Sequence, residues 1–567
     1  MLGGVAFGLL ALALVVGAAL AAKRFGLPAP VLLVGASVVY TLLPGPDLRL
    51  EPDIILVLVI PPLLFSAALS SSLLEIRANL RAVVSLSVLL VVVTALVVGA
   101  LLVTVVPGLP FAAACALGAA LAPPDAVSAL SIGRRVGLPD RLRTVIEGES
   151  LLNDATALTL YTVAVAAVVG GPFDVPFVIG QFLVATLGGI AGGIAVAWLI
   201  GRLRRRIDEP VAETAISLAT PFAAYLPAAA LHVSGVLAVV TAGLVLGHQS
   251  RQLLSGAARL HALAVWRLAD LLLEGFVFLL IGQQFVAIVP TIADYPLRTV
   301  LAAAAVTLGG VLLTRALWLL VPALLPTRLR FLSPHPHLTG HELMALSWSG
   351  MRGVISLAAV SALPLSTDAV RFPHRDLLLF CAYSTVLLTL VGQGLTFGPL
   401  LRRLGVRPDA DEGRRQRDRA RAAAAEAGLR TLRCLQEHEP IPDLLAERLS
   451  RAAEDRKQRS EDSLTALNTP ADEQIRPESP TDTFGRVRRA MIEAERDEMQ
   501  LWRDTGQLSD VSLRLLENEL DHEEGALPLP EPIVQGNWSP THREHPRPTA
   551  TVTQTTRPAT TAIDQES

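Results

Sequence analysis

Thirteen apolar runs follow one another through the first 400 or so residues, and they constrain the fold more than any other feature of the chain. A helix needs about twenty apolar residues to cross the hydrocarbon core of a bilayer, and most of these runs have that length. The pattern predicts an all-α polytopic membrane protein with about thirteen transmembrane helices. The approximate limits of the runs are 2–22, 29–44, 53–72, 82–106, 110–131, 144–170, 173–200, 211–231, 233–248, 263–289, 297–325, 341–364 and 376–400.

Charge is scarce in these runs and becomes common only after them. Of the 567 residues 17% are charged, whereas a soluble domain has about a quarter. We therefore expect a transmembrane domain over residues 1–405 and a helical tail over residues 406–525. Residues 526–567 are rich in Pro, Thr and Gln and poor in aromatics, a composition that predicts disorder.

Basic residues in the loops indicate the orientation, because cytoplasmic loops of membrane proteins are enriched in Lys and Arg. With the N-terminus outside, the thirteen runs place sixteen basic residues in inner loops and four in outer loops. A missed or an invented span would scramble this alternation from that point on. We therefore expect a multi-pass protein of the cell membrane with an external N-terminus and a cytoplasmic tail.

Two adjacent prolines, Pro123 and Pro124, interrupt the fifth run just before Asp125. Proline removes an amide donor and disfavours helical geometry in the residue before it, so the helix should break here. Broken spans are tolerated where they line a cavity. Asp125 can cap the positive end of the second half-helix, a role that also fits a helix that is merely kinked.

The sixth run begins with an unusually polar stretch, EGESLLND, at residues 147–154. Ser150 and Asp154 are four residues apart and share one helix face, while Glu149 and Asn153 share the adjoining face. A carboxylate with hydroxyl and amide oxygens suits the ligation of a hard cation such as Na⁺. Alternatively, Glu147 and Glu149 lie at the interface as a helix start, which leaves only Asp154 inside the membrane.

An arginine, Arg352, lies within the twelfth run in the sequence SGMRG, residues 349–353. Inside a span an arginine needs a partner, and Glu149 is the best candidate; otherwise Arg352 lies near a helix end and extends to the interface. The flanking glycines permit close packing or a second unwound segment. A weaker polar group with helical spacing lies at the start of the tenth run: Arg267, Asp270 and Glu274.

Together these segments resemble the sodium/proton exchanger group of the monovalent cation–proton antiporter superfamily. EGESLLND at 147–154 is similar to the ion-site helix of the group, PPD at 123–125 falls at its Thr-Asp-Pro break, and GMRGVISL at 350–357 is similar to its Gly-Leu-Arg-Gly segment. The resemblance covers about residues 5–405. It implies an inverted repeat of two six-helix units, two unwound helices that cross near the site, and a homodimer in the lipid membrane.

The resemblance also implies roles for single residues. Asp154 is implied to bind the transported cation and the proton in turn, with Ser150 as a further ligand of Na⁺. Asp125 is implied to lie at the helix crossing. Asn153, in the same ion site, stands where electrogenic relatives have a second acid, which favours electroneutral exchange of one cation for one proton unless Asp125 also titrates.

Glu149 and Arg352 are implied to form a structural ion pair, in agreement with the pairing argued above. The chain departs from the family pattern at two positions. Pro124 replaces the threonine of the break, and Ser66 stands where many members have a glutamate. Both changes remove a potential cation ligand, so K⁺ or Li⁺ is open as the exchanged ion beside Na⁺.

We therefore expect a secondary active antiporter that exchanges Na⁺ for H⁺, is not an enzyme, and needs neither a cofactor nor a nucleic acid partner. K⁺/H⁺ antiport is the alternative within this class. An intramembrane aspartyl protease is the alternative from another class, because Asp125 and Asp154 lie on successive spans. Such enzymes need Tyr-Asp and Gly-x-Gly-Asp motifs, and neither acid lies in one.

Overall fold

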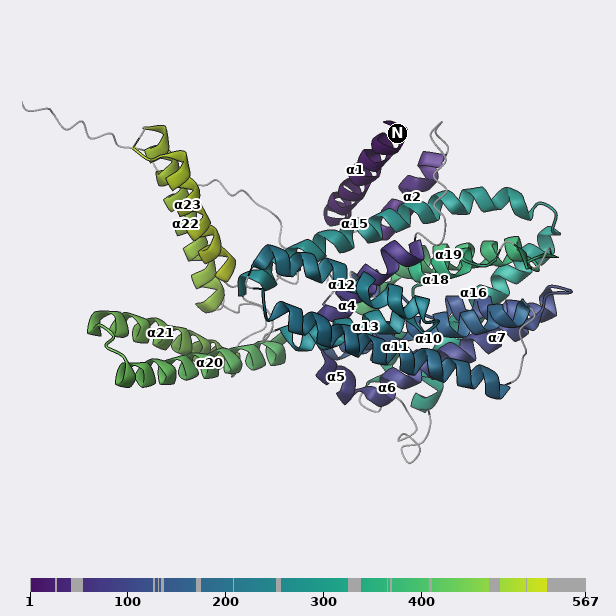
Figure 1. The fold of residues 1–567 in the computed structure, drawn as a ribbon, viewed down its shortest axis with the longest axis horizontal. Helices are drawn as coiled ribbons and strands as arrows, with labels where there is room; N and C mark the ends of the chain where they lie inside the picture. Colours follow the sequence, from purple (N-terminus) through teal and green to yellow (C-terminus); the bar gives the residue numbers. More distant parts are fainter. Residues whose placement is uncertain are drawn as a thin grey trace, which may run out of the picture. The chain divides into compact units, whose positions relative to one another are not determined.

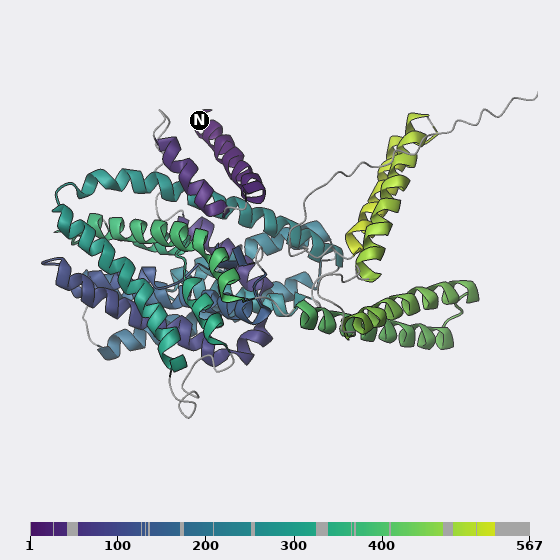
Figure 2. The ribbon, with the colours of Figure 1, turned by 180° about the vertical axis from the view of Figure 1, so that it is seen from behind.

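The computed structural model divides into two units, Met1–Ala410 and Asp411–Ser567, which are described separately. Figures 1 and 2 show the helices from opposite sides. The described residues are 2–25, 28–41, 55–125, 128–130, 132–133, 137–169, 175–207, 209–250, 256–324, 338–364, 366–367, 370–406, 410–468, 480–505 and 507–527.

The first unit is a bundle of helices, as its apolar runs predict. In chain order the helices are α1 (Leu2–Phe25), α2 (Ala29–Thr41), the π-helix η1 (Ile55–Val59), α4 (Ile60–Ser70), α5 (Leu73–Ala78), α6 (Leu80–Val84), the π-helix η2 (Ser85–Leu89), α7 (Leu90–Val105), α8 (Phe111–Leu121), α10 (Asp140–Val168), α11 (Val175–Arg204), α12 (Pro210–Ala230), α13 (Gly235–His248), α15 (Gly256–Ile288), the 3₁₀ helix η3 (Val289–Ile292), α16 (Leu297–Leu324), α17 (Gly340–Trp348), α18 (Val354–Ser361) and α19 (Arg375–Leu404). A short antiparallel pair, β1 (Ser366–Thr367) with β2 (Val370–Arg371), lies before α19.

Each predicted apolar run contains helical structure. The fifth and twelfth runs also contain non-helical residues, at 122–125 and 349–353. Within the described residues, six helices are long and apolar enough to cross a membrane, and five further apolar helices are shorter. The helical class of the chain is therefore confirmed. The number of thirteen crossing helices stays a prediction.

The outer helices expose large apolar side chains. Leu187 and Trp198 of α11, and Leu313 and Leu317 of α16, are each 59–66% exposed. Soluble monomeric proteins rarely expose contiguous apolar patches of large size. Lipid tails are a suitable neighbour for such surfaces, because the backbone polar groups of a helix are satisfied internally.

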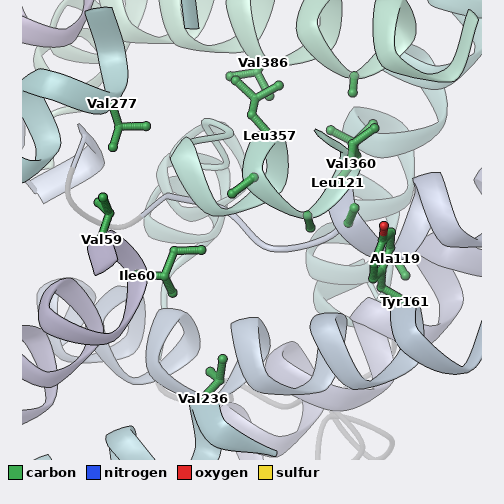
Figure 3. Packing of buried hydrophobic residues seen from close by; sticks show 14 of the residues in the cluster. Val59, Ile60, Ala119, Leu121, Tyr161, Val236, Val277, Leu357, Val360 and Val386 are labelled. Carbon is green, nitrogen blue, oxygen red and sulfur yellow. The ribbon is translucent and has the colours of Figure 1, made fainter. Parts of the chain in front are cut away.

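Helix α8 lies in the interior of the bundle. Nine of its 11 residues are buried, and seven of those nine are Ala, Gly or Cys. Small side chains let helix backbones approach closely, and α7, α10 and α18 all pack on α8. Figure 3 shows this part of the core, with Leu121 of α8 beside Val360 of α18 and close to Tyr161 of α10.

The second unit consists of four polar helices: α20 (Ala410–His438), α21 (Asp443–Asn468), α22 (Pro480–Asp504) and α23 (Asp510–Ala526). In Figures 1 and 2, α20 lies beside α21, and α22 lies beside α23. The buried carboxylate of Asp418 on α20 accepts a hydrogen bond of 2.7 Å from Ser463 on α21. The hydrogen bond from Arg488 on α22 lowers the pKa of Glu523 on α23 below its usual range.

These four helices lie where the helical tail is expected, and the domain limits at residues 406 and 525 stay a prediction. The disorder expected for residues 526–567 falls, from residue 528 onward, outside the described residues.

Candidate functional site

Two non-helical segments meet beside the C-terminus of α8. α8 ends at Leu121, and residues 122–125 follow without helical structure, as the two prolines predict. Likewise α17 ends at Trp348, and residues 349–353 separate it from α18. The backbone amide of Asp125 donates to the carbonyl of Met351, with 2.6 Å between nitrogen and oxygen. Each segment therefore satisfies a polar group that the other leaves without an intrahelical partner.

A glycine makes this close approach possible. A Cβ atom added to Gly353 would lie 2.7 Å from both Cβ and Cγ of Asp125, closer than real side chains come. The glycines at residues 349–353 predicted either close packing or an unwound segment. In the structure these residues are non-helical, and Gly353 packs directly against the Asp125 side chain.

Within the described part of the chain, Arg352 binds backbone carbonyls and no carboxylate. Its side chain is 1% exposed, its Nε donates to the carbonyl of Leu121 at 2.7 Å, and its Nη1 donates to the carbonyl of Gly350. Leu121 is the last residue of α8, where unpaired carbonyls carry partial negative charge. Arg352 thus compensates the end of the broken helix.

The prediction that Glu149 forms its ion pair with Arg352 is wrong. Glu149 is paired with Arg315 of α16 through two parallel bonds, one from Nη1 to Oε1 and one from Nη2 to Oε2 at 3.0 Å. Arg315 Nη2 also donates to the carbonyl of Leu346, at 3.1 Å. The planar fork of a guanidinium suits both oxygens of a carboxylate at once, while Arg352 is engaged at the α8 terminus.

Arg315 was not among the residues predicted from the sequence, although a signal was present. It is the one charged residue near the middle of the apolar run 297–325, whose other charge, Arg298, lies at the start of the run, and a charge at that depth needs a partner. Both partners are almost fully buried, Glu149 at 1% and Arg315 at 2% exposure. A Cβ at Gly350 would lie 2.6 Å from Cδ of Arg315, so this glycine leaves room for the arginine stem.

Helix α10 presents a second polar face, distinct from the Glu149 side. Arg143, Glu147, Ser150 and Asp154 recur at intervals of three and four residues and all line one cavity. At 1.5 Å per residue the row extends about 16 Å along the helix axis. Arg143 and Glu147 form a partly exposed ion pair of 2.7 Å at the outer end of the row. Asp154 is the acid at its inner end.

The cavity has a volume of about 510 Å³ and is walled by α4, α10, α15, the first turn of α18 and the broken segment after α8. It brings together three of the predicted site residues, Asp125, Ser150 and Asp154. Asn153 does not line it: the side chain is fully buried, and neither its amide nitrogen nor its oxygen has a hydrogen-bond partner among the described residues.

Asp154 is held in the cavity wall without a fixed partner. It is 3% exposed, and its carboxylate accepts no hydrogen bond and no ion pair from the described part of the chain. The charge of Asp125 acts on it through space, and the Ser128 hydroxyl donates to Asp125. A buried carboxylate is unfavourable unless something compensates its charge, so the site suits a small cation or a proton.

The opposite part of the wall comes from α15. Trp266 is fixed by a hydrogen bond of 3.0 Å to Ser217 and by ring contact with Phe65, with ring centroids 5.5 Å apart. One turn further, Asp270 accepts a hydrogen bond of 2.7 Å from Ser66 of α4. No ion pair joins Asp270 to Arg267 in the described structure.

Comparison with known proteins places the chain in one family. A family model described as "Sodium/hydrogen exchanger, transmembrane" matches residues 10–403. An uncharacterized Na(+)/H(+) exchanger of Mycobacterium tuberculosis is 34% identical over 536 residues, which cover 92% of this chain and 96% of the relative. A sodium, potassium, lithium and rubidium/H(+) antiporter of Bacillus subtilis is 31% identical over 381 residues, covering 64% of this chain and 56% of the relative.

The fold is also similar to a solved structure. The sodium proton antiporter MjNhaP1 from Methanocaldococcus jannaschii aligns with a TM-score of 0.57 at 19% identity, over 70% of this chain and 98% of that chain. The family match takes in both non-helical segments, the polar stretch of α10 and Arg315. This chain belongs to the sodium/hydrogen exchanger family of transmembrane proteins.

Proposed function

We propose that the chain exchanges Na⁺ for H⁺ across the cell membrane and that Asp154 is the group through which the two fluxes are coupled. The observation that carries the proposal is the contrast within α10: Glu149 is fully paired, whereas Asp154 is buried at a cavity and accepts no hydrogen bond from the described residues. A buried carboxylate without a permanent partner favours whichever cation or proton reaches it.

Competition for one carboxylate is sufficient to produce exchange. The site releases its proton when the cation binds and releases the cation when the proton binds. If the empty charged form does not cross between the two faces of the membrane, transport in one direction requires return transport of the other species. One site with one negative charge gives electroneutral exchange of one Na⁺ for one H⁺, unless Asp125 also titrates.

The oxygens around Asp154 supply further ligands. Ser150 precedes it by one helical turn and lines the same cavity, as does Asp125. Carboxylate and hydroxyl oxygens are hard donors that suit alkali cations. Asn153, beside the ion site, is the amide that stands in place of a second acid. No cofactor takes part in the proposed exchange.

Glu149 and Arg315 are proposed to be structural. Their bidentate pair ties α10 to α16, and Arg315 further binds α17 through the carbonyl of Leu346. Arg352 is proposed to stabilise the end of the broken α8. These contacts surround the junction of the two non-helical segments and would keep it in place while the cavity is exposed to one face of the membrane or the other.

The orientation follows from the loop charges. With the N-terminus outside, Arg143 at the rim of the cavity belongs to the cytoplasmic side, so the cavity would open inward and the tail would be cytoplasmic. A homodimer in the lipid membrane is part of the proposal, supported by the family resemblance.

K⁺ is the second candidate for the exchanged ion. Pro124 and Ser66 replace two potential ligands, and the Bacillus subtilis relative is named for potassium, lithium and rubidium as well as sodium. A site with fewer strong oxygen donors discriminates less by cation size.

A vesicle assay tests the proposal. Purified protein is reconstituted with an imposed pH gradient, and Na⁺, Li⁺ and K⁺ are added in turn while a pH-sensitive dye is followed. We expect Na⁺ to dissipate the gradient, at a rate that does not change when the membrane potential is clamped at different values. Absence of cation-dependent proton movement with all three ions would refute antiport, and a rate that follows the clamped potential would refute one-for-one exchange.

A further inference from the structure

We infer that Asp270 of α15 is a second cation-binding carboxylate of the exchange cavity, one that holds the hydrated cation and sets its apparent affinity. The inference rests on the proposed function and adds a residue on a different helix from Asp154. Its ligand is the transported monovalent cation, with part of its water shell retained.

Asp270 lies on the cavity face of α15. Side chains that line the cavity recur along this helix every three or four residues, among them Leu263, Trp266, Asp270 and Phe278. The turn before Asp270 is fixed on two sides, since Trp266 is bonded to Ser217 of α12 and packs on the ring of Phe65 of α4. The carboxylate therefore stands on a rigid support.

The contacts of Asp270 do not resemble those of a structural acid. One oxygen, Oδ2, accepts the hydrogen bond from Ser66, and the other, Oδ1, is buried without a partner among the described residues. No arginine or lysine of the described chain pairs with it. Glu149, in contrast, has both oxygens bonded to Arg315. A partly buried carboxylate that has an unused oxygen, and no ion pair within the described residues, can bind a cation from the cavity.

A second feature of the same cavity points to the same ligand. Asp154, only 3% exposed, faces the cavity from α10 and accepts no hydrogen bond from the described residues. Two incompletely satisfied carboxylates from different helices thus line one space, together with the hydroxyls of Ser66, Ser150 and Ser356. These groups are all oxygen donors of the kind that alkali cations bind.

The size of the cavity decides in what form the cation is held. A water molecule takes up about 30 Å³ in the liquid, so a cavity of about 510 Å³ holds a cation with several waters. Asp154 can therefore contact the ion directly while Asp270 acts on it through retained water molecules. Asp270 also places a carboxylate next to Ser66, the position on α4 where many family members have a glutamate and this chain has only a hydroxyl.

The test compares Asp270→Asn with the unchanged protein in reconstituted vesicles, with the initial rate of proton movement measured over a range of Na⁺ concentrations. We expect KM for Na⁺ to rise about tenfold, because a nearby unit charge in a partly desolvated site is worth at least that factor. The maximal rate should stay within about threefold. Asp294→Asn, on the exposed loop between η3 and α16 and outside the cavity, is the matched control and should keep the original KM.

A rescue variant separates a charge effect from damage to the fold. Ser66→Asp combined with Asp270→Asn moves the carboxylate across the 2.7 Å hydrogen bond and should lower KM again, and Asp270→Glu should keep KM close to that of the unchanged protein. An unchanged KM in Asp270→Asn overturns the inference, as does a loss of inserted protein shared by the Asn and Glu variants. Neither result touches antiport through Asp154, which the unchanged protein reports in the same assay.

Discussion

Glu149 and Asp154 are five residues apart on α10, both are almost fully buried, and they differ in what surrounds them. Glu149 faces α16, where Arg315 satisfies both of its oxygens. Asp154 faces the cavity and accepts no hydrogen bond from the described residues. Their burial is similar, so burial alone does not distinguish the acid proposed to be structural from the acid proposed to bind the transported ions. The distinction lies in whether the protein itself supplies the compensating charge.

Neutralising Asp154, the acid without a partner in the described structure, should have the largest effect on transport. Asp154→Asn removes the charge that holds the cation and the group that takes the proton, with almost no change in volume. We expect cation-dependent proton movement to fall to the level of empty vesicles, at least a hundredfold below the unchanged protein if one group carries both species. Fluorescence of a pH-sensitive dye, normalised to inserted protein, measures this.

Insertion of Asp154→Asn should be normal, because no hydrogen bond of the described fold is lost. Asp154→Glu should retain weak exchange, since the chemistry remains and the geometry shifts. Exchange by Asp154→Asn at the original rate would mean that Asp154 does not couple the two fluxes, and Asp125 would then be the candidate.

Removing either member of the Glu149–Arg315 ion pair should mainly affect the fold. Glu149→Gln and Arg315→Gln each leave one buried charge without its partner, which typically costs about 3–5 kcal/mol. We expect both single variants to melt at lower temperature in detergent and to yield less inserted protein. The double variant should be more stable than the sum of the single effects predicts, because no charge is stranded in it.

Arg352→Gln supplies the matched control for that cycle. Since Arg352 binds the carbonyls of Leu121 and Gly350, its effect should be close to additive with that of Glu149→Gln. Strong coupling between Glu149 and Arg352, together with additivity between Glu149 and Arg315, would contradict the pairing described above.

A methyl group at the junction should have a smaller effect. Gly353→Ala places a Cβ 2.7 Å from Asp125, so the two non-helical segments must move apart. Overpacking of this kind costs about 1–3 kcal/mol. It disturbs the cavity wall at Asp125 without altering any charge. Thermal melting and the rate of exchange should both fall, whereas Gly392→Ala, which has open space around its Cβ, should leave both unchanged. Equal behaviour of the two variants would mean that the contact at Gly353 is not tight.

Removal of the tail should have the smallest effect on transport. Both acids, Arg315 and the cavity belong to the unit that ends at Ala410, so a chain truncated after residue 410 should still exchange, with at most a shifted pH profile. The check is the vesicle assay on the truncated protein. Complete loss of exchange in a well-inserted truncation would show that the tail takes part in transport.

Much of the fold could be predicted from the sequence, because lipid leaves few choices to the backbone. Long apolar runs must form helices in a membrane, and each run contains helical structure. The break after α8 follows from Pro123 and Pro124 by local sterics alone. The residues gathered around Asp154 share one helix face by simple periodicity.

Contacts between helices could not be predicted in the same way. Arg315 and Arg352 are both single arginines in apolar surroundings, and nothing in the spacing along the chain says which one reaches Glu149. The partner depends on how α16 and α17 pack against α10, which is set by many small contacts far apart in sequence. The contact between Ser66 and Asp270 spans 204 positions and has the same origin.

The hydrogen bond between the amide of Asp125 and the carbonyl of Met351 joins two main chains, so its existence does not depend on which side chains stand at either position. Replacing residues 125 or 351 by anything except proline at 125 leaves donor and acceptor in place. Related proteins can therefore differ in the side chains at positions 125 and 351 and keep this contact between the two segments. The constraint on sequence falls instead on position 353, where a side chain would force the segments apart.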